Sequence, residues 1–569
     1  MCGIFALIKI NKAHQFNFNL YEEYLNSPYI TKRPQLIEEL LIKNQRPNNI
    51  NLDLDKLQLL NSRGPDYQGK IELNQPYYQL LYHSLLHMRG DQNTFIKQPL
   101  IKEQFILQYN GEIYNINPDE SDTMFLMNKL QQVQSIHDIQ KLLLSLNGDY
   151  SFIFHDLLKQ KIYIAKDPFG KRSLLLSFID NGFVLSSQAL QKNIPIEMEE
   201  EEDDEDDGKT VDEKYLMKKY LNEFNQAINK SCIELPNNSI IEINLSGQEI
   251  QWNKIQISQF LNFDQIQQID FQNTLDFNIC KIYEILIKST KEIIQNIFGF
   301  QQHFINNVQN IQQNQQQGRI GILFSGGIDC SIITHMVCKL LPDNSQIDLI
   351  NVAFLNDAPD RITAKIAHQE LQNLHKNQQL NLILIDKTLD DVYKEEKLFL
   401  EILYPKITHM DFNIAMILNI ASQYNIETRV LLSGLGADEI FCGYARYKHA
   451  LKRGHAELIE EMNFDLFRLW NRNLGRDDRA VSKNGKELRF PFLNIELVEY
   501  IRQNIHPSQY LMGDTKSILR IICQKEGLNV ISKHGKKAIQ FGTKIAKLSN
   551  KRFFGGNKKA KGTSNYNIK

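Results

Sequence analysis

The spacing of apolar residues changes character near the middle of the chain. Before residue 257, short strand-like runs such as FILQYNGEIYN (105–115) and KIYIAKD (161–167) alternate with turn signals, which is typical of layered sheets. After residue 318, strand-like and helix-like runs alternate, beginning with RIGILF (319–324). That order predicts a parallel, doubly wound sheet with sites at the carboxyl ends of its strands. We therefore expect an α+β domain followed by an α/β domain.

Low-complexity segments interrupt this pattern. The carboxylates of the acidic run Glu197–Asp207 repel one another, so we expect a solvated loop. The more specific alternative is a segment that binds a partner. Gln and Asn dominate Gln301–Gln317, which is typical of a linker. The final twenty residues are basic and contain glycine, and they predict a disordered tail.

Charge and composition exclude several classes of protein. The 65 Lys and Arg residues nearly balance the 67 Asp and Glu residues, which argues against a nucleic-acid partner. Apolar runs stop short of the roughly 20 residues that a membrane span needs. The seven cysteines are scattered without CxxC spacing, and a signal peptide is not evident, so we expect a reduced, cytoplasmic protein. The oligomeric state stays open, a homodimer included.

The second residue of the chain is a cysteine. If Met1 is removed, Cys2 carries a thiol and a free α-amino group, whose pKa near 8 lets it accept the thiol proton. Nucleophile and base would then lie on one residue. Alone this signal is weak, because a cysteine at this position is usually just a residue near a frayed end.

Three further segments offer groups for binding an amino-acid amide. Arg63 begins the turn RGPD (63–66), and its guanidinium suits a substrate carboxylate. Asn110 and Gly111 offer an amide side chain and a backbone N–H, which together suit the oxyanion of a carboxamide adduct. Asp122 offers a carboxylate for a substrate ammonium. Each has an ordinary alternative, since Arg63 and Asp122 would more often be surface charges and Asn-Gly a hairpin turn.

Two glycine-containing turns follow predicted strands in the second half. SGGIDCS (325–331) leads into a predicted helix, whose N-terminus and glycine N–H groups favour an anion. It lacks the lysine of a Walker loop, and alone it would be an ordinary strand–helix turn. SGLGADE (433–439) also ends a strand, so Asp329 and Asp438 could converge on one Mg²⁺–nucleotide.

A basic segment, KHGKKAIQFGTKIAKL (533–548), comes near the end of the second half. Lys536 or Lys537 could neutralise charge on a departing pyrophosphate. The alternative is a basic surface helix.

Taken in order, these motifs resemble the asparagine synthetase family, in which a class II glutamine amidotransferase domain precedes an ATP-pyrophosphatase domain. The resemblance is closer to the eukaryotic asparagine synthetase domain-containing proteins. It covers most of the chain and is carried by CGI, RGPD, NGEIYN, SDT, GDYSFIFHD, KDPFGKRSLL, SGGID, SGLGADE, NLGRDDR, LRFPFL and KKAIQFGTKIAK.

The resemblance implies a fold for each part. A four-layer αββα Ntn-hydrolase sandwich is expected over 2–256, with the acidic loop 197–212 inserted. A linker is expected over 257–317, a doubly wound ATP-pyrophosphatase domain over 318–548, and a disordered tail over 549–569.

The resemblance also implies a reaction. Cys2 hydrolyses glutamine, whose carboxylate and amine Arg63 and Asp122 hold, while Asn110 and Gly111 stabilise the oxyanion. Ammonia passes through an internal channel to a site where ATP and Mg²⁺ activate aspartate as β-aspartyl-AMP, and asparagine forms. Val352 would lie near the adenine. The implied ATP and pyrophosphate residues are Ser325, Gly326, Gly327, Asp329, Cys330, Ser331, Val352, Ser433 and Gly434, with Mg²⁺ on Asp329 and Asp438 and charge neutralisation by Lys536 or Lys537.

Two positions depart from the family. Leu435 stands where active synthetases carry a glutamate that serves as a base, and loss of a general base typically costs about 10²- to 10⁴-fold in rate. Cys330 replaces a serine of the phosphate turn, and a thiol is a poorer hydrogen-bond partner. Three hypotheses therefore stay open: a working synthetase, a glutaminase whose second domain takes another acceptor or binds ATP as a regulator, and a scaffold without turnover.

Overall fold

The computed structural model describes most of the chain and leaves several segments out. The described residues are 2–9, 57–74, 77–89, 95–179, 182–190, 232–246, 251–257, 274–297, 299–306, 318–405, 408–424 and 427–554.

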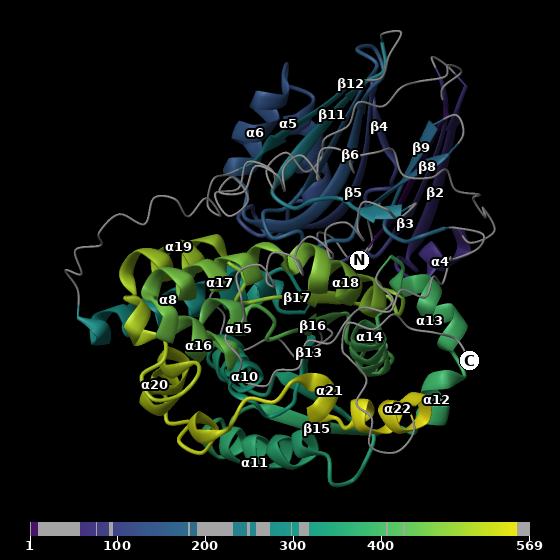
Figure 1. The fold of residues 1–569 in the computed structure, drawn as a ribbon. Helices are drawn as coiled ribbons and strands as arrows, with labels where there is room; N and C mark the ends of the chain where they lie inside the picture. Colours follow the sequence, from purple (N-terminus) through teal and green to yellow (C-terminus); the bar gives the residue numbers. More distant parts are fainter. Residues whose placement is uncertain are drawn as a thin grey trace.

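Two antiparallel six-stranded sheets pack face to face in the N-terminal part (Figure 1). The first sheet has the order β10-β8-β9-β1-β3-β2, and the second has the order β12-β11-β7-β6-β5-β4. The strands of the first sheet are β1 (Gly3–Lys9), β2 (Tyr67–Leu73), β3 (Tyr78–Leu85), β8 (Leu175–Ile179), β9 (Gly182–Ser186) and β10 (Cys232–Glu234). Those of the second are β4 (Leu100–Lys102), β5 (Phe105–Ile113), β6 (Gly148–Asp156), β7 (Lys161–Lys166), β11 (Ser239–Asn244) and β12 (Gln251–Gln256).

Alternation along β1 and β6 explains how the layers form. In β1, Ile4 faces the core between the sheets, whereas Phe5 faces the outer side with Leu60 of α4 (Gln58–Asn61). In β6, Ile153 points to the inter-sheet core and Phe152 to the opposite face. That opposite face is covered by α5 (Asp122–Leu130) and α6 (Ile136–Leu144). The described residues thus show the two sheet layers with helices on both outer sides.

The C-terminal part is built on a parallel five-stranded sheet with the order β15-β14-β13-β16-β17. Its strands are β13 (Arg319–Leu323), β14 (Gln346–Ala353), β15 (Gln379–Asp386), β16 (Val430–Leu432) and β17 (Glu487–Arg489). The mixed α/β fold and the parallel second sheet confirm the predicted fold class. Buried Ile, Leu and Val residues dominate the central strands β13, β14 and β16, which helices cover on both faces, whereas the edge strand β15 is mostly partly exposed.

Helices follow the strands in the predicted alternation. The connections through α10 (Ile328–Leu340) and α11 (Pro359–Leu374) run in one direction across the sheet. The return to β16 passes through α14 (His409–Ser422), so right-handed crossovers place α14 on the opposite face. The remaining helices are α8 (Leu275–Ile294), α9 (Gln301–Asn306), α12 (Leu389–Tyr393), α13 (Glu396–Leu403), α15 (Ala437–Ile440), α16 (Arg446–Arg453), α17 (His455–Phe467), α18 (Gly475–Ser482), α19 (Ile495–Asn504), α20 (Ser517–Lys525), α21 (Ile539–Gly542) and α22 (Ile545–Phe554).

The structure differs from the sequence-based expectation at two segments. Part of the expected linker, 257–317, is the twenty-residue helix α8, which packs on α10, α19 and α20 as part of the C-terminal core. Its buried Ile279, Ile282, Leu286 and Ile293 carry a helical period that the linker interpretation overlooked. Helix α9 occupies the start of the Gln/Asn-rich stretch, and α22 extends to Phe554 in the expected tail. The acidic loop and residues 307–317 and 555–569 lie outside the described residues, and the predicted domain limits stay predictions.

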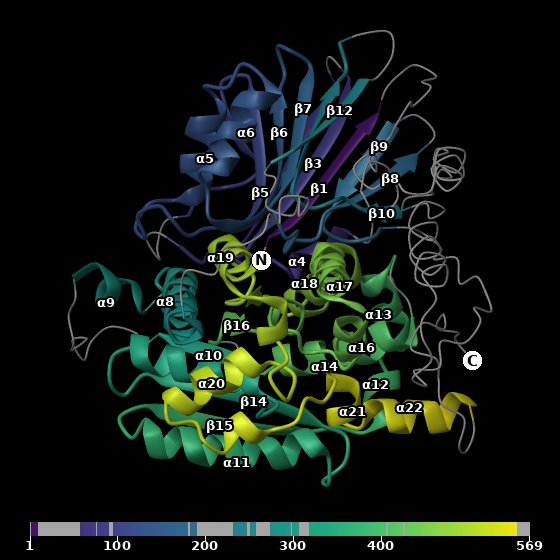
Figure 2. The ribbon, with the colours of Figure 1, turned by 60° about the vertical axis from the view of Figure 1, so that its left-hand side comes forward.

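Buried ion pairs join the two parts of the chain. Figures 1 and 2 show the start of β1 at the junction, above α18. Arg479 of α18 donates to Glu234 at 2.6 Å and to Ser173 Oγ at 2.7 Å. Arg172 donates to the carbonyl of Leu488 at 2.9 Å. None of the described helices is long and apolar enough to cross a membrane.

Candidate active sites

Cys2 lies at the start of β1, an interior strand of the first sheet, and contacts β5 of the second sheet. Its backbone N–H donates to Asn110 Oδ1 at 2.9 Å, and its side chain is buried. Burial raises the pKa of the Cys2 thiol to about 11. The thiol is therefore protonated at neutral pH, so it needs a base to act as a nucleophile.

Asn110 and Gly111 lie together on β5, as the sequence predicted for an oxyanion site. Asn110 Oδ1 accepts the N–H of Cys2, so the Nδ2 of Asn110 points away from that N–H. This Nδ2 is buried and has no hydrogen-bond partner among the described residues. At Gly111 a Cβ would lie 2.1 Å from the carbonyl oxygen of Asp149, so no larger residue fits. An unpartnered buried donor beside a cysteine is what an oxyanion site requires.

Arg63 is fully buried next to Cys2 and is not a surface charge. Its Nε donates to the carbonyl of Cys2 at 3.3 Å, and its Nη2 donates to Asp478 Oδ2 at 2.8 Å. The Nη1 atom has no partner among the described residues. Only this side of the guanidinium is left for a substrate carboxylate.

Asp122 begins α5 and lies near the same end of β5. The hydroxyl of Tyr109 donates to Asp122 Oδ2 at 3.2 Å. Burial raises the pKa of Asp122, while the guanidinium of Arg89 partly offsets that rise. Burial and the nearby Asp122 carboxylate also raise the pKa of Glu112 to about 8, so a cationic ligand at this end of the strand would stabilise the charged forms of both carboxyls.

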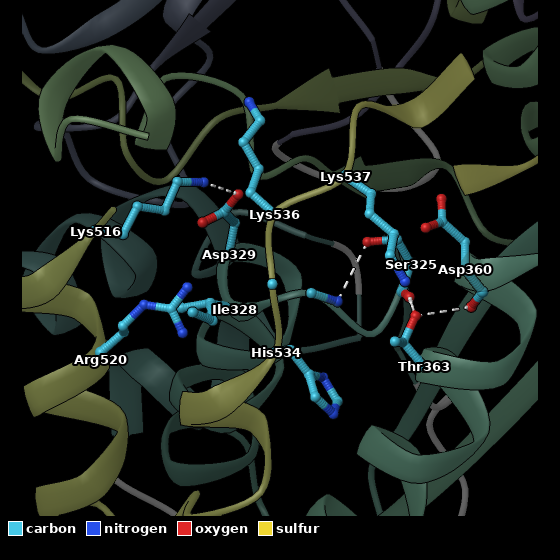
Figure 3. Close-up of a pocket in the computed structure, with 12 residues that line it drawn as sticks. Ser325, Ile328, Asp329, Asp360, Thr363, Lys516, Arg520, His534, Lys536 and Lys537 are labelled. Atoms are coloured by element: carbon cyan, nitrogen blue, oxygen red, sulfur yellow. Dashed lines mark hydrogen bonds and ion pairs between the residues drawn. The ribbon is translucent and has the colours of Figure 1, made fainter. Parts of the chain in front are cut away.

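A pocket in the C-terminal domain lies where β13 ends and α10 begins (Figure 3). The side chains around it are mainly cationic. Figure 3 shows Lys516 facing Asp329 across one part of the pocket and Thr363 beside Ser325 on another. The lining residues are Ser325, Gly327, Ile328, Asp329, Asp360, Thr363, Lys516, Arg520, His534, Gly535, Lys536 and Lys537.

The two predicted aspartates do converge, and a lysine joins them. Lys516 Nζ lies 2.6 Å from Asp329 Oδ2 and 2.7 Å from Asp438 Oδ1, and Lys536 Nζ lies 2.5 Å from Asp438 Oδ2. Burial raises the pKa of Asp329. Burial acts the same way on Asp438, but Lys516 and Lys536 outweigh it and lower the pKa of that carboxyl to about 2.

Glycines allow the two turns to approach each other. At Gly326, with φ of 75°, a Cβ would lie 2.4 Å from the backbone of Thr363 and Ala364. At Gly434 a Cβ would lie 2.7 Å from the Cβ of Asp329. The glycine spacing read from the sequence therefore has a steric cause in the fold.

Several predicted residues lie behind the pocket rather than in its lining. The Cys330 thiol donates to the carbonyl of Gly327 at 3.3 Å, and the Ser331 hydroxyl is buried in α10. Val352 is buried in β14. The Ser433 hydroxyl accepts from the N–H of Leu435 at 3.3 Å. These four hold the turns and strands rather than line the cavity.

Sequence reasoning missed Lys516, Arg520 and His534, together with Asp360 and Thr363. Lys516 and Arg520 lie at the start of α20 in the segment TKSILR (515–520), which carries no glycine or acidic signal. The nearest clue was a lysine just before an amphipathic helix, which is common on surfaces.

A divalent cation with a polyphosphate fits this donor set. The single ammonium that bridges Asp329 and Asp438 marks one point at which their oxygens converge, and Asp329 Oδ1 is buried with no hydrogen-bond partner among the described residues. The described residues contain no group of three or more metal-ligating side chains. Mg²⁺ at that point would therefore complete its ligands with phosphate oxygens and water, as Mg²⁺ usually does.

Leu435 is partly buried against the apolar core of the C-terminal domain. The neighbouring carboxylate, Glu439, accepts the hydroxyl of Tyr444 at 2.6 Å. Burial raises the pKa of Glu439 to about 7, and its second oxygen is buried without a partner in the described part of the chain. A titratable base thus exists near the turn, although it is not part of the pocket lining.

Comparisons with known proteins agree with this two-part architecture. A glutamine amidotransferase domain model matches residues 41–252, and an asparagine synthase model matches residues 309–459 and 450–541. Neither model covers the whole chain, and they match separate parts of it.

Three relatives extend the similarity over most of the chain. An asparagine synthetase domain-containing protein of Saccharomyces cerevisiae is 29% identical over 86% of this chain and 87% of its own length. Asparagine synthetase domain-containing protein 1 of Gallus gallus is 26% identical over 86% of this chain and 93% of its own length. The glutamine-hydrolysing asparagine synthetase of Homo sapiens is 23% identical over 69% and 64%. The chain therefore carries a glutamine amidotransferase domain followed by an asparagine synthase domain, and over most of its length it is similar to asparagine synthetase domain-containing proteins.

Proposed function

We propose that the protein catalyses the glutamine- and ATP-dependent amidation of aspartate to asparagine through β-aspartyl-AMP. One observation carries the proposal: Cys2 lies beside an unpartnered amide donor in one domain, and in the other Lys516 of a cationic pocket joins Asp329 of the pocket lining to the neighbouring Asp438. Buried ion pairs join the two domains, so both sites belong to one folded unit.

At the first site Cys2 attacks the side-chain amide of glutamine. The thiol needs a base, because burial raises its pKa to about 11. After removal of Met1 the α-amine of Cys2 supplies that base. Asn110 Nδ2 and the Gly111 N–H stabilise the oxyanion, while Arg63 and Asp122 bind the α-carboxylate and α-amine.

At the second site the pocket binds the phosphates of ATP. Lys516, Lys536, Lys537 and Arg520 surround the place where negative charge grows as pyrophosphate departs. Bound Mg²⁺, held by Asp329 and Asp438, would neutralise part of that charge. Ammonia released by the first site then displaces AMP from the activated aspartate.

Leu435 supports a second candidate function. Its side chain cannot accept a proton, so attack by ammonia lacks the base that active synthetases use. A glutaminase that serves another acceptor, or that binds ATP only as a regulator, would not need that base. The third alternative, a scaffold without turnover, has no physical need for an unpartnered amide beside Cys2.

Product analysis separates these functions. Purified protein is supplied with glutamine, aspartate, Mg²⁺ and ATP, and glutamate, asparagine and AMP are quantified separately. Asparagine and AMP formed together support the synthetase, and Cys2→Ala should abolish both unless ammonia is added. Glutamate without asparagine or AMP supports the second candidate, and no product supports the scaffold.

Leu435→Glu tests whether the base alone is missing. A large rise in asparagine formation, with glutamate formation unchanged, would show that the pocket is otherwise competent. Leu435→Gln is the matched control, because it adds a similar polar side chain without a carboxylate.

A further inference from the structure

Arg63 is held by atoms from both domains. Its Nε contacts the carbonyl of Cys2 at 3.3 Å, in the N-terminal domain. Its Nη2 contacts Asp478 Oδ2 at 2.8 Å, and Asp478 lies 415 residues later on α18. Both side chains of this ion pair are 0% exposed. Water therefore does not screen the pair.

The two contacts determine where the rest of the guanidinium points. A guanidinium is planar and rigid, so fixing Nε and Nη2 also fixes the direction of Nη1. This Nη1 is the buried donor of Arg63 that has no partner among the described residues. The donor available for a substrate carboxylate is thus aimed by Asp478.

Asp478 is itself held firmly by the C-terminal domain. Two residues before it, Arg476 donates to Asp411 of α14 at 2.7 Å. One residue after it, Arg479 donates to the carbonyl of Leu403 at 3.1 Å. Arg479 also contacts Glu234 and Ser173 of the N-terminal domain, so Asp478 lies in a segment that is held on both sides and is not free to follow Arg63 if that side chain turns.

We propose that Asp478 is a positioning residue for glutamine: the asparagine synthase domain orients Arg63 in the amidotransferase domain. This inference rests on the proposed glutaminase function. It makes glutamine affinity a property of both domains, because the ligand for the α-carboxylate is set from the second one. The opposite reading, in which Asp478 sequesters Arg63 from substrate, predicts tighter glutamine binding once the pair is broken.

The test compares full-length wild-type protein with Asp478→Asn, measuring the ammonia released from the side-chain amide, which glutamine and its α-amide both yield. We expect the KM for glutamine to rise about 10- to 100-fold, as misplacement of a binding group typically causes, with kcat changed less than about threefold. The α-amide of glutamine lacks the carboxylate that Arg63 would bind. The KM for this substrate should be the same for both proteins.

Arg429→Gln is the matched control for a loosened domain contact. Arg429 pairs with Asp66 of the same turn at 2.6 and 3.1 Å, from the same second domain, but it does not contact Arg63. Its effect on KM should be small and equal for both substrates. Alkylation of Cys2 by iodoacetamide at an unchanged rate would show that Asp478→Asn has kept the site folded.

The possible outcomes separate the two proposals. An unchanged or lower KM for glutamine in Asp478→Asn, with wild-type protein active, overturns the positioning role and leaves the proposed function standing. An equal rise in KM for both substrates also overturns it. A wild-type protein that forms no glutamate overturns the proposed glutaminase and this inference with it. If Asp478→Asn does not fold, Asp478→Glu is used instead. Its KM should rise for glutamine and stay unchanged for the α-amide, which lacks the α-carboxylate.

Discussion

Replacing Lys516 by methionine removes one positive charge and keeps a side chain of similar length. The ammonium of Lys516 is buried between Asp329 and Asp438, at 2.6 and 2.7 Å from their oxygens. Without it, Asp329 loses this ion-pair partner, whereas Asp438 keeps Lys536 at 2.5 Å. The variant therefore leaves one partly buried carboxylate without its counter-charge.

The loss of stability in Lys516→Met can be estimated from the ion-pair contacts that are lost and kept. Removing one partner of a buried ion pair costs about 3–5 kcal/mol, and the lower end applies here because the Asp329 side chain is 26% exposed and Asp438 keeps its Lys536 contact. For a domain of this size, about 3 kcal/mol corresponds to a fall on the order of 10 °C in Tm. We expect this fall in the unfolding transition of the C-terminal domain.

Mg²⁺ should reverse the loss, because the cation and the ammonium compete for the same oxygens. Differential scanning calorimetry is run on wild type and Lys516→Met, with and without Mg²⁺ and a non-hydrolysable ATP analogue. The ligands should raise the Tm of the variant more than that of wild type.

Lys533→Met is the matched control, since Lys533 is an exposed lysine in the same domain that does not line the pocket. It should unfold like wild type under both conditions. A Lys516→Met protein with unchanged Tm, or with the same response to ligands as wild type, would refute the shared position of ammonium and cation.

Three other substitutions have outcomes that the structure specifies. Gly434→Ala places a methyl group 2.7 Å from the Cβ of Asp329, so the turns must separate; stability should fall by about 1–3 kcal/mol and calorimetric titration should show weaker binding of an ATP analogue. Burial raises the pKa of Glu439 from 4.5 to about 7, so the wild type should lose about 3 kcal/mol of stability as pH rises through this window, whereas Glu439→Gln should lose much less in urea unfolding. Arg479→Met leaves Glu234 with only part of its counter-charge and should cost about 3 kcal/mol, seen in calorimetry as a lower transition temperature of the N-terminal domain; an unchanged transition would contradict a stabilising role for that contact.

The predicted elements agree with the structure where hydrophobic spacing was unambiguous. The run RIGILF became β13, and the helix expected after SGGID became α10. The linker interpretation was wrong at α8. The segment lies next to a Gln/Asn-rich stretch, but its apolar residues recur with a helical period. Local spacing encodes an element whether or not its neighbours are of low complexity.

Backbone geometry explains why glycine occupies two of the predicted site positions. At Gly326 a Cβ would meet the backbone of Thr363 and Ala364, and at Gly434 it would meet the Cβ of Asp329, so only glycine allows these close approaches. Asp329 and Asp438 followed from the rule that sites lie at the carboxyl ends of parallel strands. Their roles in catalysis stay predictions until the products are measured.

By itself, the sequence determined the two-domain order, the alternation of strands and helices, the strand-like run that carries Asn110 and the turns that carry Asp329 and Asp438, because each depends on residues close together along the chain. Only the tertiary structure decided that Lys516 bridges two aspartates and that Asp478 holds Arg63. The latter pair is separated by 415 residues. Ion pairs of this kind form only when whole domains pack together. Burial removes water from around the charges, and their interaction then becomes strong enough to fix the side chains of the site.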